Sequence, residues 1–126
     1  RKEAETKLRA HLDKHGFTDV EANVTGGYDP TEVAEDSRLV RAAIATYQRG
    51  GAKVSLSPRA AGSWPGATFT AAPVSVPACG FGLGYGTGAH APNEFFVIES
   101  SNPKIAGLDD ATKGFADFLY QMASLK

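Results

Sequence analysis

The chain has 126 residues, of which 42% are hydrophobic and 21% charged, as in a soluble globular domain with a real core. Thirteen basic and fourteen acidic residues give a formal net charge of −1 without blocks of like charge, which argues against nucleic acid or an anionic membrane as a partner. The single cysteine, Cys79, excludes an internal disulfide and fits a reducing compartment. No apolar run is long enough to span a bilayer.

The first residues, from Arg1 on, read directly as helix, without an initiator methionine or a signal-like segment. This start predicts an internal cut in a longer polypeptide; we expect a cytoplasmic location and leave an upstream targeting signal open. Residues 3–15 have helical spacing, with Leu8 and Leu12 on one side. Residues 19–24 then alternate between polar and apolar, as a half-buried strand does. The pair is typical of the tail of a two-layer α+β unit.

Turn-forming residues at 26–30 are the best candidate for a domain boundary. The elements expected beyond them are, in chain order, a helix at 38–49 capped by Ser37, a strand at 53–56, a brief helix at 66–72, a strand at 74–79, an apolar β-like segment at 95–98 and a last helix capped by Asp109 or Asp110. This order predicts an α/β fold with helices packed on a mainly parallel sheet. In such folds, sites gather at loops that follow strands.

A glycine-rich loop leads to a single histidine. Glycine occupies every second position from Gly80 to Gly88, and His90 follows directly. Neutral imidazole nitrogen suits zinc, and Asn93 and Glu94 can orient the ring. From spacing alone, however, a hydrogen-bonded structural histidine is the favoured interpretation of His90.

The pattern Gly-x-His-x-x-Asn-Glu, from Gly88 to Glu94, resembles the C-terminal metal-ligand motif of the dinuclear zinc amidohydrolases. That family includes aminoacylase, acetylornithine deacetylase, succinyl-diaminopimelate desuccinylase, glutamate carboxypeptidase and carnosine-type dipeptidase. The resemblance implies that His90 binds one metal ion, with Asn93 and Glu94 supporting it.

A second stretch resembles the same family, whose members commonly carry Arg-x-Gly-Gly-Ser-Ile-Pro upstream of the ligand histidine. The matching residues are Arg59, Gly62, Ser63 and Pro65. Ala61 replaces a glycine and Trp64 an isoleucine. A guanidinium, a hydroxyl and loop amides suit a carboxylate, and the resemblance implies that Arg59, Gly62 and Ser63 bind the substrate's carboxylate or acyl end. Without the resemblance, Arg59 is a surface arginine and Ser63 a turn hydroxyl.

The order of the two motifs and of the expected elements is similar to that of the family, so the resemblance covers essentially the whole chain, but only the C-terminal part of a family member. They imply that residues 1–28 are the remnant of an inserted lid and dimerisation domain and that residues 29–126 belong to the zinc hydrolase catalytic domain. The family binds two zinc ions per active site, with cobalt or manganese as alternatives, and cleaves an amide bond in a dipeptide or N-acyl amino acid. The implied partners are a small peptide or N-acyl amino acid and a second copy in a homodimer.

The family's other ligands, among them a His-x-Asp, and its general-base glutamate lie upstream. One histidine cannot hold a catalytic zinc, which needs about three protein ligands. The chain alone is therefore expected to be inactive and to need the missing N-terminal part of the same polypeptide. The alternative hypothesis is a stand-alone, non-catalytic binding or assembly module.

Three other patterns have simpler interpretations. Residues 84–89 fit a dinucleotide-binding glycine pattern, but a proline and a β-like segment follow where a helix should begin. His11 and His15, four apart, could bind a metal, although a polar helix C-terminus is the favoured interpretation. Cys79 has no catalytic signature beside it and is most simply a buried strand residue.

Overall fold

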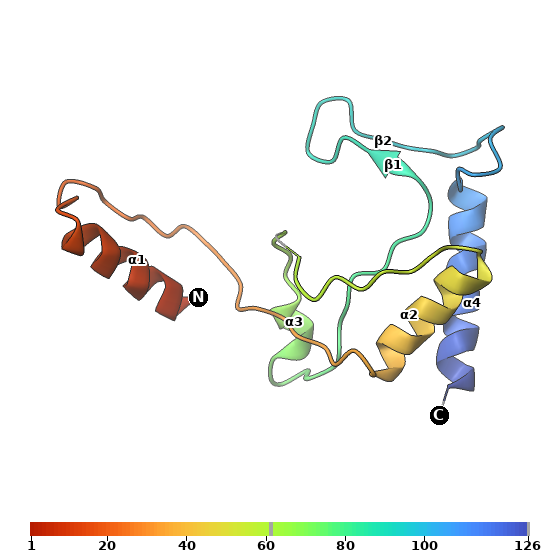
Figure 1. Ribbon diagram of the computed structural model, residues 1–126, viewed down its shortest axis with the longest axis horizontal. Helices are drawn as coiled ribbons and strands as arrows, with labels where there is room; N and C mark the ends of the chain where they lie inside the picture. The colour runs from red at the N-terminus through yellow and green to blue at the C-terminus, as the bar shows by residue number, and fades with distance from the viewer. Residues whose placement is uncertain (61, 126) are drawn as a thin grey trace. The chain divides into compact units, whose positions relative to one another are not determined.

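The computed structural model describes residues 1–60 and 62–125 (Figure 1). Its elements are, in chain order, α1 (Lys2–Lys14), α2 (Arg38–Arg49), α3 (Ala67–Thr70), β1 (Gly86–Thr87), β2 (Phe95–Phe96) and α4 (Leu108–Ser124). Helices make up 37% of the chain. Among the described residues, no helix is both long and apolar enough to cross a membrane.

The predicted α/β fold with a mainly parallel sheet is wrong. The described residues contain one sheet of two short antiparallel strands, in which Gly86 pairs with Phe96 and Thr87 with Phe95. The strands expected at 19–24, 53–56 and 74–79 are absent from the described residues. Of the expected β segments, the one at 95–98 contains β2, whose partner β1 lies in the glycine-rich stretch where no strand was expected.

The reason lies in where each element finds its hydrogen bonds. A helix satisfies its backbone internally, whereas a strand needs a second strand beside it. Within the described part of the chain, the backbone of residues 53–56 has no such neighbour. The Val76 N–H instead donates to the Phe69 carbonyl at 2.9 Å, in a turn that follows α3. The helical expectations, which need no partner, are confirmed for α1, α2, α3 and α4.

The chain divides into two compact units. Unit 1 comprises Arg1–Glu32 and Ala60–Ala78, and unit 2 comprises Val33–Arg59 and Cys79–Lys126.

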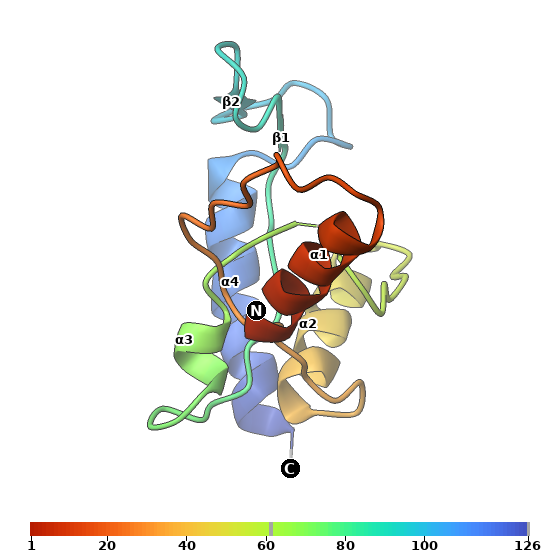
Figure 2. The same ribbon diagram turned by 90° about the vertical axis from the view of Figure 1, so that its left-hand side faces the viewer.

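In unit 2, helices α2 and α4 lie side by side (Figures 1 and 2). Ser37 is the N-cap of α2, where its hydroxyl accepts a hydrogen bond from the Val40 N–H at 3.3 Å, as its position predicted. The buried side chains are mostly small, which lets the two helices approach closely; they are Val40, Ala42, Ala43, Thr46 and Ala111. Polar contacts join the same helices at their edges: the Arg38 guanidinium donates to the Met122 carbonyl, and Arg49 pairs with Asp117 at 3.1 Å.

The segment before β1 packs on this helix pair through aromatic rings. The Phe81 ring lies 4.7 Å from that of Phe118 and 5.5 Å from that of Phe115, measured between ring centres. The Tyr47 ring is 5.2 Å from Phe81, and the Tyr47 hydroxyl donates to the carbonyl of Gly82 and accepts from its N–H. These contacts attach the glycine-rich stretch to α2 and α4.

The start of α4 differs in detail from its sequence prediction. Gly107 is the N-cap, and the Asp110 carboxylate accepts a hydrogen bond from the Gly107 N–H at 3.1 Å. Asp110 therefore supports the first turn from inside the helix and is not itself the N-cap.

In unit 1, α1 has no buried residue. Ion pairs four residues apart support it, Lys7 with Glu3 at 2.6 Å and Arg9 with Glu5 at 3.0 Å. The short helix α3 packs through Phe69, whose ring lies 6.5 Å from that of Trp64 in a stacked arrangement.

Candidate functional site

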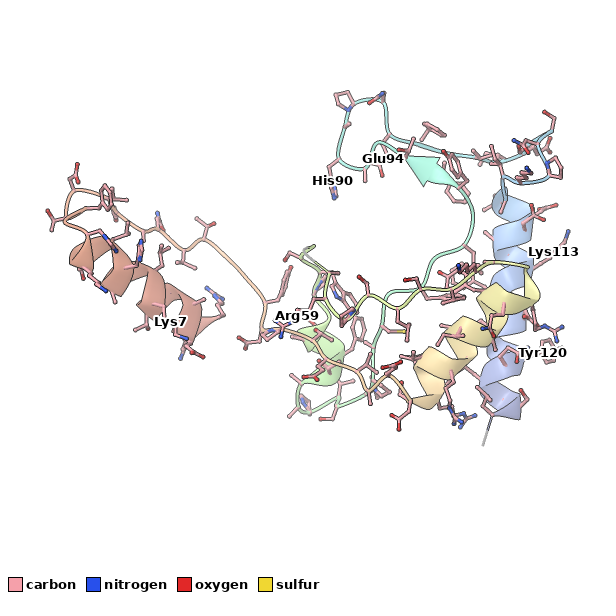
Figure 3. All side chains as sticks on the ribbon, in the orientation of Figure 1. Lys7, Arg59, His90, Glu94, Lys113 and Tyr120 are labelled. Atoms are coloured by element: carbon pink, nitrogen blue, oxygen red, sulfur yellow. The ribbon has the colours of Figure 1, made fainter. Side chains whose placement is uncertain are left out.

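His90 lies in the connection between the two strands of the hairpin in unit 2 (Figure 3). The Ala91 N–H donates to the Gly88 carbonyl at 2.8 Å, and the Glu94 N–H donates to the Ala91 carbonyl at 3.0 Å, so two successive turns define this connection. Glycine is needed at two positions before His90. A Cβ at Gly86 would lie 2.6 Å from the Phe95 carbonyl oxygen, and Gly88 has φ +76°. The glycine-rich sequence thus allows the hairpin to close and to carry His90 in its loop.

The His90 side chain is exposed, and its ring has no hydrogen bond, ion pair or ring contact with the described residues. Its backbone has φ +65°, a left-handed conformation that is unusual for a residue with a side chain. A histidine that served only to complete a core would be buried and hydrogen-bonded. This histidine instead presents both ring nitrogens to the surroundings.

Glu94 holds the backbone of His90, not its ring. The Glu94 Oε2 atom accepts a hydrogen bond from the His90 N–H at 3.2 Å, whereas the Asn93 side chain makes no hydrogen bond within the described residues. His90 and Glu94 are therefore in contact through the main chain of His90. This hydrogen bond restrains the backbone from which the His90 side chain projects. The ring-orienting role suggested for Asn93 and Glu94 has no counterpart among these contacts.

No complete metal site is formed by the described residues. They contain no group of three or more histidine, cysteine, aspartate or glutamate side chains that could hold one ion. One His-x-Asp triplet occurs in the sequence, at His11 and Asp13, but it lies within α1. His90 thus offers one imidazole, whereas a catalytic zinc needs about three protein ligands.

The residues expected to bind a carboxylate lie on the stretch between α2 and α3. Arg59 is exposed, and its guanidinium has no partner among the described residues (Figure 3). Gly62 and Ser63 are exposed as well, and nothing lies within 4 Å of the position that a Cβ would take at Gly62. Ala61 lies outside the described residues. Arg59 belongs to unit 2, while Gly62 and Ser63 belong to unit 1.

Close packing fixes the residues that follow this loop. A Cβ at Gly66 would lie 2.5 Å from the Thr31 hydroxyl oxygen and 2.6 Å from the Trp64 ring. Glycine is therefore required at this position, and the Trp64 indole, stacked on Phe69, packs within unit 1.

Sequence reasoning did not foresee a shallow hollow beside the hairpin. It has a volume of about 300 Å³ and is lined by Gly86, Thr87, Ala89, Glu94, Phe95 and Phe96. The signal for this hollow in the sequence is the consecutive pair Phe95 and Phe96. Such a pair is equally typical of a buried strand, so it does not predict a hollow.

In the part of the chain that the structure describes, the pKa values of two side chains are shifted. A hydrogen bond of 2.8 Å from the α-amino group of Arg1, together with its charge, lowers the pKa of Asp29. Partial burial raises the pKa of the Cys79 thiol, which disfavours the nucleophilic thiolate. Cys79 is only partly buried and lies outside the strands of the described residues, so its interpretation as a buried strand residue is wrong.

Comparisons of the chain with protein-family models, with curated proteins and with solved structures found no match.

Proposed function

We propose that this chain is the C-terminal part of a zinc-dependent amidohydrolase or peptidase that cleaves an amide bond in a dipeptide or an N-acyl amino acid. His90 supplies one metal ligand, and Arg59, Gly62 and Ser63 bind the carboxylate of the substrate. The observation that carries the proposal is the exposed imidazole of His90, which has no partner among the described residues and sits on a backbone with φ +65°. Backbone strain of this kind concentrates at functional positions.

The chain contributes binding groups and not a complete catalytic centre. The described residues offer one imidazole to an ion that needs about three protein ligands, so they do not fit a catalytic zinc by themselves. In the proposal, the remaining ligands and the general base come from the N-terminal part of the polypeptide. The isolated chain is inactive, and the complete protein is a cytoplasmic homodimer that takes zinc, cobalt or manganese.

Exposed apolar side chains support the view that each unit packs against further protein. In unit 2, Leu119 is 67% exposed and Tyr120 76% exposed, although both lie on the long helix α4 (Figure 3). In unit 1, Phe17, Val20 and Val74 are each about half exposed. Single apolar residues on a surface are ordinary. Many exposed apolar side chains on a chain that buries few, however, support the proposal that part of this surface is covered by further protein.

A second candidate is a non-catalytic binding or assembly module. The lack of a three-ligand group within the described residues favours it, and the exposed apolar side chains are compatible with it. The two candidates differ in what they require of His90: only the hydrolase needs its imidazole.

The test uses the complete polypeptide with N-acyl amino acids and dipeptides as substrates. His90→Ala is expected to lower kcat/KM by about 100-fold or more and to reduce the bound zinc, because a metal ligand is lost. Arg59→Ala is expected to raise KM roughly 10- to 100-fold with a smaller change in kcat, because a charge-assisted hydrogen bond to the substrate is lost.

Lys113→Ala is the matched control, since it removes an exposed cation on α4 and should leave both parameters unchanged (Figure 3). Undiminished hydrolysis and zinc content in His90→Ala would contradict the hydrolase and favour the assembly module. An Arg59→Ala variant that behaves like the Lys113→Ala control would contradict the carboxylate-binding role alone.

A further inference from the structure

Two histidine rings lie together at the C-terminal end of α1. His11 is in the last turn of the helix and His15 is its C-cap. The His15 N–H donates to the His11 carbonyl at 3.1 Å, so the helical turn remains closed through His15. The ring centres are 4.4 Å apart and the ring planes are tilted by 43°. Side chains four residues apart on a helix share one face, which explains their proximity.

Neither ring is engaged with the rest of the described chain. Both side chains are exposed, and apart from their contact with each other they have no hydrogen bond or ion pair with the described residues. Asp13 is two positions from each histidine and therefore points to another face of the helix. The ring nitrogens are thus accessible, and no protein donor or acceptor competes for them.

We propose that His11 and His15 form a two-histidine chelating site for a late first-row divalent metal ion. Imidazole nitrogen suits copper, nickel and zinc, whereas magnesium and calcium prefer oxygen ligands. A metal lies about 2.0 Å from each imidazole nitrogen, so two rings bound at right angles to one ion have centres roughly 4.5 Å apart. The observed distance between the ring centres, 4.4 Å, is close to this value.

The site also stabilises the helix that carries it. No residue of α1 is buried, so its last turn has little tertiary support. Both rings can bind one ion only when that turn is helical. Binding of the ion therefore raises the population of the helix. The remaining coordination positions are filled by water, which makes the site one for reversible binding. This proposal does not depend on the hydrolase function.

The test is calorimetric titration of the untagged 126-residue chain with nickel chloride, followed by copper chloride and magnesium chloride. Nickel is expected to bind the pair, copper more tightly than nickel, and magnesium not at all. His11→Gln and His15→Gln should each lose affinity by roughly tenfold or more, because one remaining imidazole no longer chelates, and the double variant should bind no more tightly than either single variant. Far-ultraviolet circular dichroism should show a metal-dependent gain in helix only in the unaltered chain.

A rescue experiment separates chelation from an effect on folding. In the His15→Gln background, Lys7→His restores a spacing of four residues with His11 and should restore nickel affinity and the gain in helix. Lys7→Gln in the same background is the matched control and should restore neither. The proposal is overturned if either single variant keeps the full affinity, or if Lys7→His fails to recover it.

Discussion

Helices α1 and α2 have nearly the same length, 13 and 12 residues, yet different interactions hold them. Four residues of α2 are buried, its first turn is capped by Ser37, and its partner is α4. By contrast, α1 has no buried residue and no side-chain cap, and ion pairs along its own surface connect its turns. The two helices show that similar helical sequence patterns do not reveal how much tertiary packing a helix will have.

The comparison predicts different sensitivities to substitution. Packing contributes more to helix stability in a protein than local ion pairs, which are worth a few tenths of a kcal/mol each. Changes to the α2 interface should therefore affect the free energy of unfolding strongly. Changes on α1 should mainly affect its own helix content.

The largest expected effect comes from enlarging a side chain between α2 and α4. Ala42 is 0% exposed, so Ala42→Leu must displace its neighbours and should lower the free energy of unfolding of unit 2 by about 1–3 kcal/mol. The measurement is urea unfolding followed by circular dichroism. Ala4→Leu, on the exposed surface of α1, is the matched control, with an expected change within about 0.5 kcal/mol. Equal effects of the two substitutions would remove the distinction between the helices.

A smaller effect should follow from removing the cap of α2. Ser37→Ala leaves the Val40 N–H without its hydroxyl partner and should cost about 1 kcal/mol in the same unfolding experiment. Ser101→Ala, at an exposed loop serine, should change stability by no more than about 0.5 kcal/mol. If both variants unfold at the same urea concentration, the cap does not contribute to α2.

The smallest effect should come from α1. Glu5→Gln removes the ion pair with Arg9 but leaves the Arg9 hydrogen bond to the Ala22 carbonyl, so the loss should be about 0.3 kcal/mol at low salt. Helix content measured by circular dichroism should fall slightly, and the difference should disappear at high ionic strength. A loss of helix content that persists in 1 M salt would contradict a stabilisation of α1 by the charge of the Glu5 carboxylate.

The sequence was sufficient to predict the helices because their signals are local. The Ser37 cap, the glycine after α2 and the apolar spacing within α4 each lie within a few residues of the element that they define. The strands at 53–56 and 74–79 were predicted from composition alone, and the described residues offer them no pairing partner. Strand composition indicates that a segment tolerates extended structure, but a sheet also needs a second chain segment.

The sequence proposes the residues of the candidate site but does not specify their contacts. The glycine pattern predicted a turn before His90, and the structure has His90 in the connection between β1 and β2, where Gly88 has φ +76° and a Cβ at Gly86 would lie 2.6 Å from the Phe95 carbonyl oxygen. The contact of Glu94 with the His90 N–H, in contrast, depends on the register of the hairpin, which a run of alternating glycines specifies weakly. The joint binding of one carboxylate by Arg59 and Ser63 is a prediction from the resemblance.

The Tyr47 hydroxyl occupies both main-chain groups of Gly82, donating at 2.6 Å and accepting at 3.0 Å. One phenol oxygen thus takes the place of both the carbonyl oxygen and the N–H group that a neighbouring strand would offer to Gly82. Because both main-chain groups of Gly82 are already satisfied, no further chain segment can form backbone hydrogen bonds with the glycine-rich stretch at this residue while the Tyr47 hydroxyl stays in place.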